Sequence, residues 1–269
     1  MSVPNVAGMT NHFAHVVRGS GPGLLLAHGA GGGVEGNFGS ILDDLARTHT
    51  VVGPDYPGSG ATPRSTEPLD LDAVADELVS IAVDAGLERF AILGYSLGTA
   101  VAVRATTRHP DRVTGLILTA GLAKPDTRLL LGLDVWRELL RGDRRLLAKY
   151  LTFAGTGEKQ LNALTPAELE AAIDGLAEFI PEGSPEHVDL VANVDTRAEL
   201  AGVSVPTLVV ATTLDRFVPP THSRELAAGI PGAELVEIEA GHGIGAEAPG
   251  EWLGVIQKFL SASVGEGTN

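Results

Sequence analysis

Short apolar runs alternate with amphipathic stretches along most of this chain. The apolar runs are rich in Leu, Ile and Val and end at Gly, Pro or polar residues, as expected for strands buried on both faces of a parallel sheet. The predicted strands are Leu24–Ala27, Val51–Val52, Phe90–Leu93, Val113–Thr119, Thr207–Ala211 and Glu234–Ile238. The alternation predicts an α/β fold with a mostly parallel central β-sheet and helices on both faces.

The stretches between these runs predict helices. The segment Leu71–Ile81 places its apolar residues at helical spacing, with Asp70 as the expected N-cap. Further helices are expected over Leu97–Arg108 and His222–Ala228, and Pro249 opens a last one. Strands and helices therefore alternate in both the first and the last part of the chain.

The alternation of predicted strands and helices stops in the middle of the chain. From about Leu122 to Leu200 the pattern predicts several helices and no strand. Thr165 and Glu168 stand three residues apart around a Pro, which is the spacing of a capping box at a helix start. We therefore expect a core domain of residues 1–121 and 201–269, interrupted by a helical insertion of residues 122–200.

The charge and the composition argue against several classes of binding partner and of chemistry. The net charge of −15 over 269 residues opposes binding to nucleic acid phosphates and to anionic membranes. The chain has no Cys, which excludes disulfides and thiolate chemistry. The longest nearly uncharged apolar run, Val113–Ala123, is shorter than the about 20 residues that span a bilayer. Met1–Asn5 shows no signal-peptide pattern, so we expect a cytoplasmic protein that acts on a small molecule.

A G-x-S-x-G motif, Gly94–Gly98, lies between a predicted strand and a predicted helix. In such a strand-to-helix turn the glycines permit a tight bend, and the strained central Ser exposes its hydroxyl above the sheet. The motif alone is a weak signal in a chain with 34 Gly. Its position between a strand and a helix makes Ser96 the expected nucleophile.

A nucleophilic Ser needs a base and an acid that orients the base. His242 follows the predicted strand ending at Ile238 and is flanked by two Gly, so it should lie at the same sheet edge as Ser96. Asp215 is the first carboxylate after the strand Thr207–Ala211, although it could instead cap the next helix. The other histidines have less suitable positions; they are His12, His15, His28, His49, His109, His187 and His222.

The Gly-rich loop after the first strand predicts an oxyanion-binding site. A backbone N–H of this loop, that of Ala30 or alternatively of Gly31, could pair with the N–H of Leu97. His28 is expected to anchor the loop. Gly31–Gly36 also reads as G-x-G-x-x-G, the dinucleotide-binding pattern, but three residues separate it from the strand, and a negative charge would lie beside the pyrophosphate.

Five motifs in order make the chain resemble the α/β-hydrolase superfamily over nearly its whole length. His28–Ala30 resembles the oxyanion loop of the family, and Asp55–Gly60 its D-x-x-G-x-G turn. Ser96 lies at the nucleophile elbow, Asp215 precedes a V-P pair and His242 follows Gly. The resemblance implies a Ser–Asp–His triad, a cap formed by the helical insertion, and no need for a metal or cofactor. Thr99 departs from the second Gly that often follows this elbow.

The expected reaction is hydrolysis of a carboxylic ester or lactone of a mid-sized, fairly apolar small molecule through an acyl-enzyme on Ser96. The same triad would also serve a C–C bond hydrolase, a thioesterase or a cofactor-free haloperoxidase-like enzyme. A non-hydrolytic lyase or cyclase, or an inactive ligand-binding relative, is the alternative of another class. The oligomeric state stays open. The candidate pocket residues are Tyr95, Trp136, Phe153 and Val218.

Overall fold

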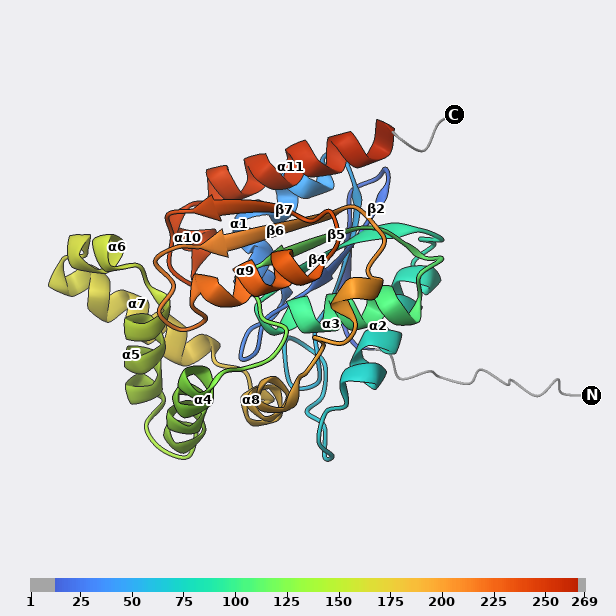
Figure 1. Cartoon of the computed structure of the whole chain (residues 1–269). Helices are drawn as coiled ribbons and strands as arrows, with labels where there is room; N and C mark the ends of the chain where they lie inside the picture. The colour runs from blue at the N-terminus through green and yellow to red at the C-terminus, as the bar shows by residue number, and fades with distance from the viewer. Residues whose placement is uncertain (1–12, 266–269) are drawn as a thin grey trace, which may run out of the picture.

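The computed structural model describes residues 13–265, so the expectations for Met1–Asn5 and His12 lie outside the described residues. Seven strands form one sheet in the order β1-β3-β2-β4-β5-β6-β7 (Figure 1). Only the edge strand β1 is antiparallel to its neighbour. The strands are β1 (His15–Arg18), β2 (Gly23–Ala27), β3 (Thr50–Pro54), β4 (Phe90–Tyr95), β5 (Val113–Thr119), β6 (Thr207–Thr212) and β7 (Glu234–Ile238). The predicted α/β fold is confirmed.

Helices cover both faces of the sheet (Figure 1). One face packs against α2 (Leu71–Asp84), α3 (Leu97–Arg108) and α9 (Pro220–Gly229). The other face packs against α1 (Val34–Ala46), α10 (Ile244–Glu247) and α11 (Pro249–Gly265). The Asp70 side chain accepts a hydrogen bond from the Ala73 N–H, which confirms it as the N-cap of α2.

Alternate residues of the central strands enter two separate cores. In β2, Leu24 and Leu26 contact the α1 and α11 side, whereas Leu25 contacts the α2 and α3 side, and all three are fully buried. Burial of a Leu side chain contributes roughly 1.5–3 kcal/mol. The strands need apolar residues at every position because both faces are covered, which explains their unbroken apolar runs.

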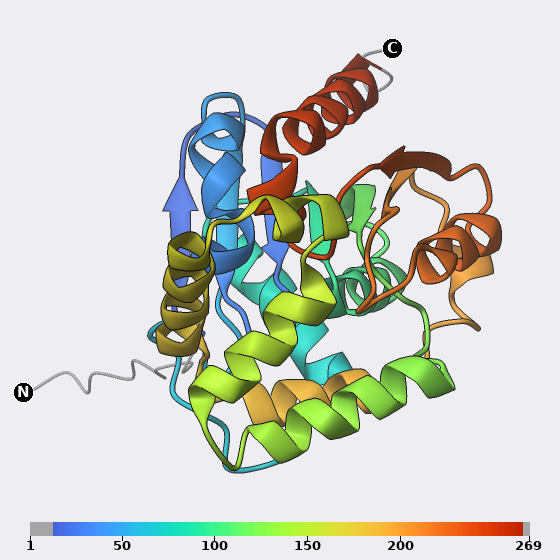
Figure 2. The ribbon, with the colours of Figure 1, turned by 90° about the vertical axis from the view of Figure 1, so that its left-hand side faces the viewer.

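The segment between β5 and β6 contains five α-helices and one 3-10 turn, Leu200–Gly202, and no strand. The helices are α4 (Thr127–Leu139), α5 (Arg144–Gly155), α6 (Glu158–Ala163), α7 (Pro166–Phe179) and α8 (Ser184–Asn193). The predicted capping box between Thr165 and Glu168 is present at the start of α7. Figures 1 and 2 show this helical insertion beyond the carboxyl ends of the strands, facing the viewer in Figure 2.

The sequence pattern did not predict two helices of the core domain, α1 and α10. Helix α1 includes Gly36 and Gly39, which weaken its intrinsic helix propensity, and it forms because Phe38, Ile41 and Leu42 are buried against the sheet. The short helix α10 follows His242 and has one buried residue, Ile244. Neither helix carries a strong local signal, since packing rather than propensity stabilises both. Within residues 13–265, no helix is both long and apolar enough to cross a membrane.

The start of α3 lies unusually close to two neighbouring strands. A Cβ on Gly98 would lie 1.9 Å from the carbonyl oxygen of Ala27, so any other residue there would force α3 away from β2. Thr99 occupies the space beside Gly121, where a Cβ would lie 2.2 Å from its methyl group. The Thr99 hydroxyl donates to the Ser96 carbonyl and accepts from the Leu122 N–H. Gly121 thus accommodates the Thr that departs from the family pattern.

We predict that Gly121→Ala lowers the free energy of unfolding by about 1–3 kcal/mol, because overpacking a tight core contact costs that much. In a Thr99→Gly background the added destabilisation should be smaller, since the colliding side chain is gone. Urea unfolding of the four proteins measures this coupling. Gly254→Ala is the matched control, because its Cβ would meet open space on α11. Equal effects of Gly121→Ala in both backgrounds would contradict the packing assignment.

Candidate active site

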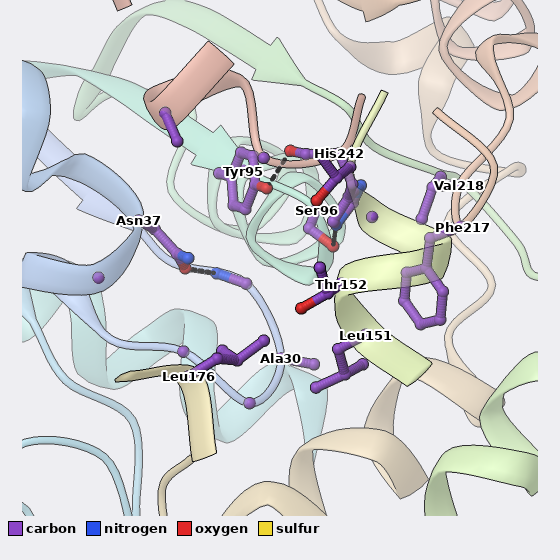
Figure 3. A pocket seen from close by; sticks show the side chains of 18 of the residues that line it. Ala30, Asn37, Tyr95, Ser96, Leu151, Thr152, Leu176, Phe217, Val218 and His242 are labelled. Carbon is purple, nitrogen blue, oxygen red and sulfur yellow. Dashed lines mark hydrogen bonds between the residues drawn. The ribbon is translucent and has the colours of Figure 1, made fainter. Parts of the chain in front are cut away.

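Ser96 lies in a strained turn between β4 and α3. Its φ of 54° and ψ of −120° belong to a region that non-Gly residues rarely adopt. Gly94 and Gly98 permit the turn, because a Cβ on Gly94 would lie 2.5 Å from the Gly98 carbonyl oxygen. The strain therefore falls on Ser96, whose side chain Figure 3 shows beside His242 at the pocket.

The structure brings Ser96, His242 and Asp215 together from three loops at the carboxyl edge of the sheet. The Ser96 Oγ lies 3.0 Å from the His242 Nε2, and the His242 Nδ1 lies 2.6 Å from the Asp215 Oδ2. A carboxylate only accepts hydrogen bonds, so Nδ1 carries the proton and Nε2 is free to accept from the Ser96 hydroxyl. This is the arrangement in which an imidazole can act as a base toward a hydroxyl.

The Asp215 carboxylate is fully buried and held by four donors. Its Oδ1 accepts from the backbone N–H groups of Phe217 and Val218, both at 2.8 Å. Its Oδ2 accepts from the Thr212 hydroxyl at 3.1 Å, besides the His242 Nδ1–H. Because no side chain caps α9, the alternative role of Asp215 as its cap does not apply. The carboxylate is fixed in one orientation toward the imidazole.

The Gly-rich loop after β2 presents one free backbone donor beside Ser96. Within residues 13–265 the N–H groups of Ala30 and Leu97 donate to no protein acceptor. The Gly31 N–H instead donates to the His187 Nδ1 at 3.2 Å, and the Gly29 N–H to the Asn37 Oδ1 at 2.8 Å. Ala30 rather than Gly31 is therefore available to pair with Leu97 in binding an oxyanion.

Two buried histidines hold this loop in their neutral form. The His28 Nε2 accepts from the Tyr56 N–H at 2.8 Å, and its Nδ1 donates to the Gly29 carbonyl. His187 accepts from Gly31 and donates through Nε2 to the Pro57 carbonyl at 3.0 Å. Burial lowers the pKa of His28 from 6.5 to about 3, helped by repulsion from His187. Burial likewise lowers the pKa of His187 to about 4.

Asp55 lies where the dinucleotide-binding pattern would need a ribose ligand. Its Oδ1 accepts instead from the Val34 N–H at the start of α1, at 2.8 Å. A Cβ on Gly60 would lie 2.1 Å from the other carboxylate oxygen, so the glycine permits this close approach. Asp55 is half-buried and lines a second cavity, of about 610 Å³. The D-x-x-G-x-G turn thus holds the start of α1, next to the oxyanion loop, through the Asp55 carboxylate.

A cavity of about 670 Å³ lies between Ser96 and the helical insertion. Its walls include the predicted pocket residues Tyr95, Trp136 and Val218. Figure 3 shows Ser96 and His242 at one side of this cavity, with Phe217 and Val218 next to them. The walls are mostly apolar and come from the core loops and from α4 to α8.

The expectation for Phe153 is wrong. Its side chain is 62% exposed and lies outside the cavity wall, whereas its neighbours Leu151 and Thr152 line the cavity. Successive residues of a helix are about 100° apart around its axis. Phe153, one residue after Thr152, therefore lies on the solvent side of α5. The apolar type of Phe153 suggested a pocket residue, but only the packing of α5 decides which face is inward.

Glu247 joins the His242 loop to the helical insertion. Its carboxylate accepts from the Gly241 N–H at 2.9 Å and from the Gly157 N–H at 3.1 and 3.2 Å. A Cβ on Gly241 would lie 2.4 Å from the Gly157 nitrogen, so both glycines are needed for this approach. The Gly243 N–H also donates to the Gly155 carbonyl, and Tyr95 donates its hydroxyl to the His242 carbonyl.

Sequence reasoning did not find three residues of this site, namely Asn37, His187 and Glu247. His187 acts on Gly31, which is 156 positions away, so no local pattern links the two. Asn37 belongs to the helix that the pattern missed. Glu247 had a usable signal, because it is the first charged residue after His242.

Comparison with known proteins agrees with this geometry. Residues 22–249 match the family model described as the alpha/beta hydrolase fold. The chain belongs to this family and is an α/β-hydrolase enzyme, as the five motifs indicated.

Two curated relatives and one solved structure illustrate the family. The chain is 30% identical over 249 residues to pyrrolizixenacetamide deacetylase of Xenorhabdus hominickii, covering 92% of this chain and 94% of that protein. It is 26% identical to a putative carbamate hydrolase RutD of Azorhizobium caulinodans, covering 92% and 94%. A thermophilic esterase from Thermogutta terrifontis superposes with a TM-score of 0.78 at 25% identity, covering 93% of each chain.

The buried histidines predict an acid-sensitive fold. The pKa of His187 is 6.5 when unfolded and about 4 when folded, so between these pH values the unfolded chain binds more protons. Its contribution to stability is therefore present above pH 6.5 and is lost as the pH falls toward 4. We predict that His187→Gln reduces the loss of unfolding free energy between pH 6.5 and 5 by about 2 kcal/mol.

Urea unfolding at several pH values measures this difference. Glutamine keeps one acceptor and one donor for Gly31 and Pro57 but does not titrate. His15→Gln serves as the matched control, because His15 is exposed on β1. If the free energy of unfolding of His187→Gln depends on pH as that of the wild type does, the assignment of a buried neutral imidazole is contradicted.

Proposed function

We propose that this enzyme is a serine hydrolase that cleaves a carboxylic ester or lactone of a mid-sized, fairly apolar small molecule through an acyl-enzyme on Ser96. The observation that carries the proposal is the continuous chain of hydrogen bonds from Ser96 through His242 to Asp215. The free N–H groups of Ala30 and Leu97 beside the hydroxyl support it.

In the first step, the Ser96 Oγ attacks the carbonyl carbon while the His242 Nε2 takes its proton. The carbonyl π electrons move to the oxygen, and the N–H groups of Ala30 and Leu97 stabilise that negative charge. The buried Asp215 carboxylate stabilises the imidazolium. When the tetrahedral species collapses, His242 gives the proton to the leaving oxygen, and an alcohol departs.

In the second step, a water molecule gives a proton to the His242 Nε2 and attacks the acyl carbon. Collapse breaks the bond between this carbon and the Ser96 Oγ, and His242 returns the proton to Ser96. The carboxylic acid leaves and the enzyme is restored. Every proton in both steps moves through the His242 Nε2. Asp215 keeps the His242 ring in the tautomer that these transfers require.

The helical insertion is proposed to act as the cap that shapes substrate choice, with residues 122–200 as its extent. Its helices supply much of the apolar wall, including Leu129, Leu133, Trp136 and Leu176. A cavity of about 670 Å³ suits a small molecule rather than a polymer. Nucleic acid and anionic membranes remain poor candidates at a charge of −15, and a cytoplasmic location stays a prediction.

We predict that the wild-type enzyme hydrolyses p-nitrophenyl esters of two to eight acyl carbons and that Ser96→Ala abolishes this turnover. The chain-length preference should favour medium acyl chains, because the cavity walls are apolar. Release of p-nitrophenolate measures the rate, and circular dichroism shows whether the variant is folded. A folded wild type without activity on any ester would overturn the esterase proposal.

Replacement of the acid tests the role of the buried carboxylate. Asp215→Asn should lower kcat by about three to four orders of magnitude, because the amide can donate to His242 Nδ1 and favour the wrong tautomer. KM should change little, because Asp215 is fully buried and does not line the cavity. Stopped-flow and steady-state kinetics with one p-nitrophenyl ester measure both constants. An Asp215→Asn enzyme with nearly full kcat would show that Asp215 is not the orienting acid.

Amide deacylation is a second candidate function. It is favoured by the relative of 30% identity that is named a deacetylase and that the chain covers over 94% of its length. An amine is a poorer leaving group than an alcohol, so the same His242 proton transfer becomes more demanding. Parallel assays of phenyl acetate and acetanilide, analysed by chromatography, compare the two classes. Equal or faster turnover of the amide would assign the enzyme to deacylation of amides.

A further inference from the structure

The cavity beside Ser96 is mostly apolar, and apart from Ser96 and His242 its polar side chains fall into two sets. Asn37, Thr152, Thr156, Gln160 and the buried Trp136 Nε1–H have donors without a partner among the described residues, whereas Glu247 and Tyr95 are engaged. Glu247 is the only charged side chain apart from the triad among the cavity residues that the structure describes. Both of its oxygens accept from backbone N–H groups of Gly157 and Gly241. The Tyr95 hydroxyl donates to the His242 carbonyl. These groups have no need of a substrate partner.

Asn37 offers an unpaired donor to the cavity. Its Oδ1 must be the atom near the Gly29 nitrogen, because that N–H needs an acceptor. The side-chain NH2 is thereby oriented, and it donates to no acceptor within residues 13–265. Asn37 is part of the cavity wall, and Figure 3 shows it on the α1 side beside the oxyanion loop.

Thr152 offers a second unpaired group from the helical insertion. Its hydroxyl takes part in no hydrogen bond with the described residues, although Thr in a helix often donates to its own backbone. Thr152 also lines the cavity, and Figure 3 shows its hydroxyl oxygen directed away from the ribbon of α5. Asn37 and Thr152 are both half-buried, so a bound substrate would displace water from their polar groups, and a substrate oxygen is needed to replace those hydrogen bonds.

We infer that the Asn37 NH2 and the Thr152 hydroxyl are specificity determinants that donate hydrogen bonds to a second oxygen of the substrate. This inference rests on the proposed function of Ser96 and names its substrate class. The substrate is a neutral ester, lactone or amide that carries an additional ether, hydroxyl or carbonyl oxygen in an otherwise apolar skeleton.

The charge distribution of the cavity favours a neutral second group. No Lys or Arg belongs to the cavity wall in the described part of the chain, so a substrate carboxylate would have no cation to pair with. Glu247 and the net charge of −15 would repel it further. A neutral oxygen needs only a donor, which Asn37 and Thr152 provide.

Matched esters test the inference. The acyl series compares p-nitrophenyl pentanoate with p-nitrophenyl 3-methoxypropanoate and 4-oxopentanoate, and the alcohol series compares pentyl butyrate with 2-ethoxyethyl butyrate. Each kcat/KM is divided by the rate of hydroxide-catalysed hydrolysis of the same ester, which removes the inductive effect of the oxygen. We expect the oxygen-containing ester of at least one series to be preferred by roughly 5–10-fold, the value of one neutral hydrogen bond.

Variants assign that preference to its donors. Thr152→Val is nearly isosteric and lacks the hydroxyl, so it should bring the preference close to one. Asn37→Asp keeps an acceptor for the Gly29 N–H but removes the NH2, and it should also reduce the preference. Thr127→Val is the matched control, because Thr127 is exposed at the start of α4 and lies outside the cavity. A preference that survives both Thr152→Val and Asn37→Asp would overturn the inference, as would its absence in both series.

Failure of the proposed function gives a different result. If the wild type hydrolyses none of these esters, calorimetry with Ser96→Ala compares the binding of the alkyl and oxygen-containing members of each series. Tighter binding of an oxygen-containing member, lost in Ser96→Ala combined with Thr152→Val, would support the recognition pair without the esterase activity. Equal affinities would overturn the recognition pair itself.

Discussion

The active site depends on the close crossing of α3 over β2 at Gly98. A single added carbon there would meet the Ala27 carbonyl at 1.9 Å. Because α3 starts so close to the sheet, the chain must turn within one residue, and that residue is Ser96 with its positive φ. The same turn leaves the Leu97 N–H without an acceptor and directs it, with the first turn of α3, toward the place where an oxyanion would form. One packing contact thus fixes both the proposed nucleophile Ser96 and one of the two N–H groups of the proposed oxyanion site.

The second half of that support is fixed by neutral imidazoles. His28 and His187 together place the backbone of the oxyanion loop, and each uses one ring nitrogen as an acceptor and the other as a donor. A Lys or Arg could not accept from a backbone N–H, and a carboxylate could not donate to a carbonyl. A neutral imidazole performs both tasks without charge, so the loop next to the proposed oxyanion carries no fixed ion that would compete with it.

Local sequence signals were sufficient where one segment determines its own structure. The run Val113–Thr119 is β5 to the residue, because a strand covered on both faces must be apolar throughout. The capping box of α7 also lies within four residues. Local sequence signals failed where contacts between distant segments determine the structure. Examples are the glycine-containing α1 and Phe153, whose inward or outward position depends on how α5 packs. The positions of the three triad residues in chain order followed from motifs, but the pairing of Gly31 with His187 required the folded insertion.

The contact of Glu247 with both Gly241 and Gly157 has a consequence for how the enzyme opens. Any motion that lifts the α5–α6 junction away from the core must break the bonds from the Gly157 N–H to Glu247 and the bond from the Gly243 N–H to the Gly155 carbonyl. The segment 241–247, which carries His242, would then lose these hydrogen bonds to the helical insertion. A molecule too large to let the insertion settle back would therefore meet a His242 segment that only the core domain holds in place.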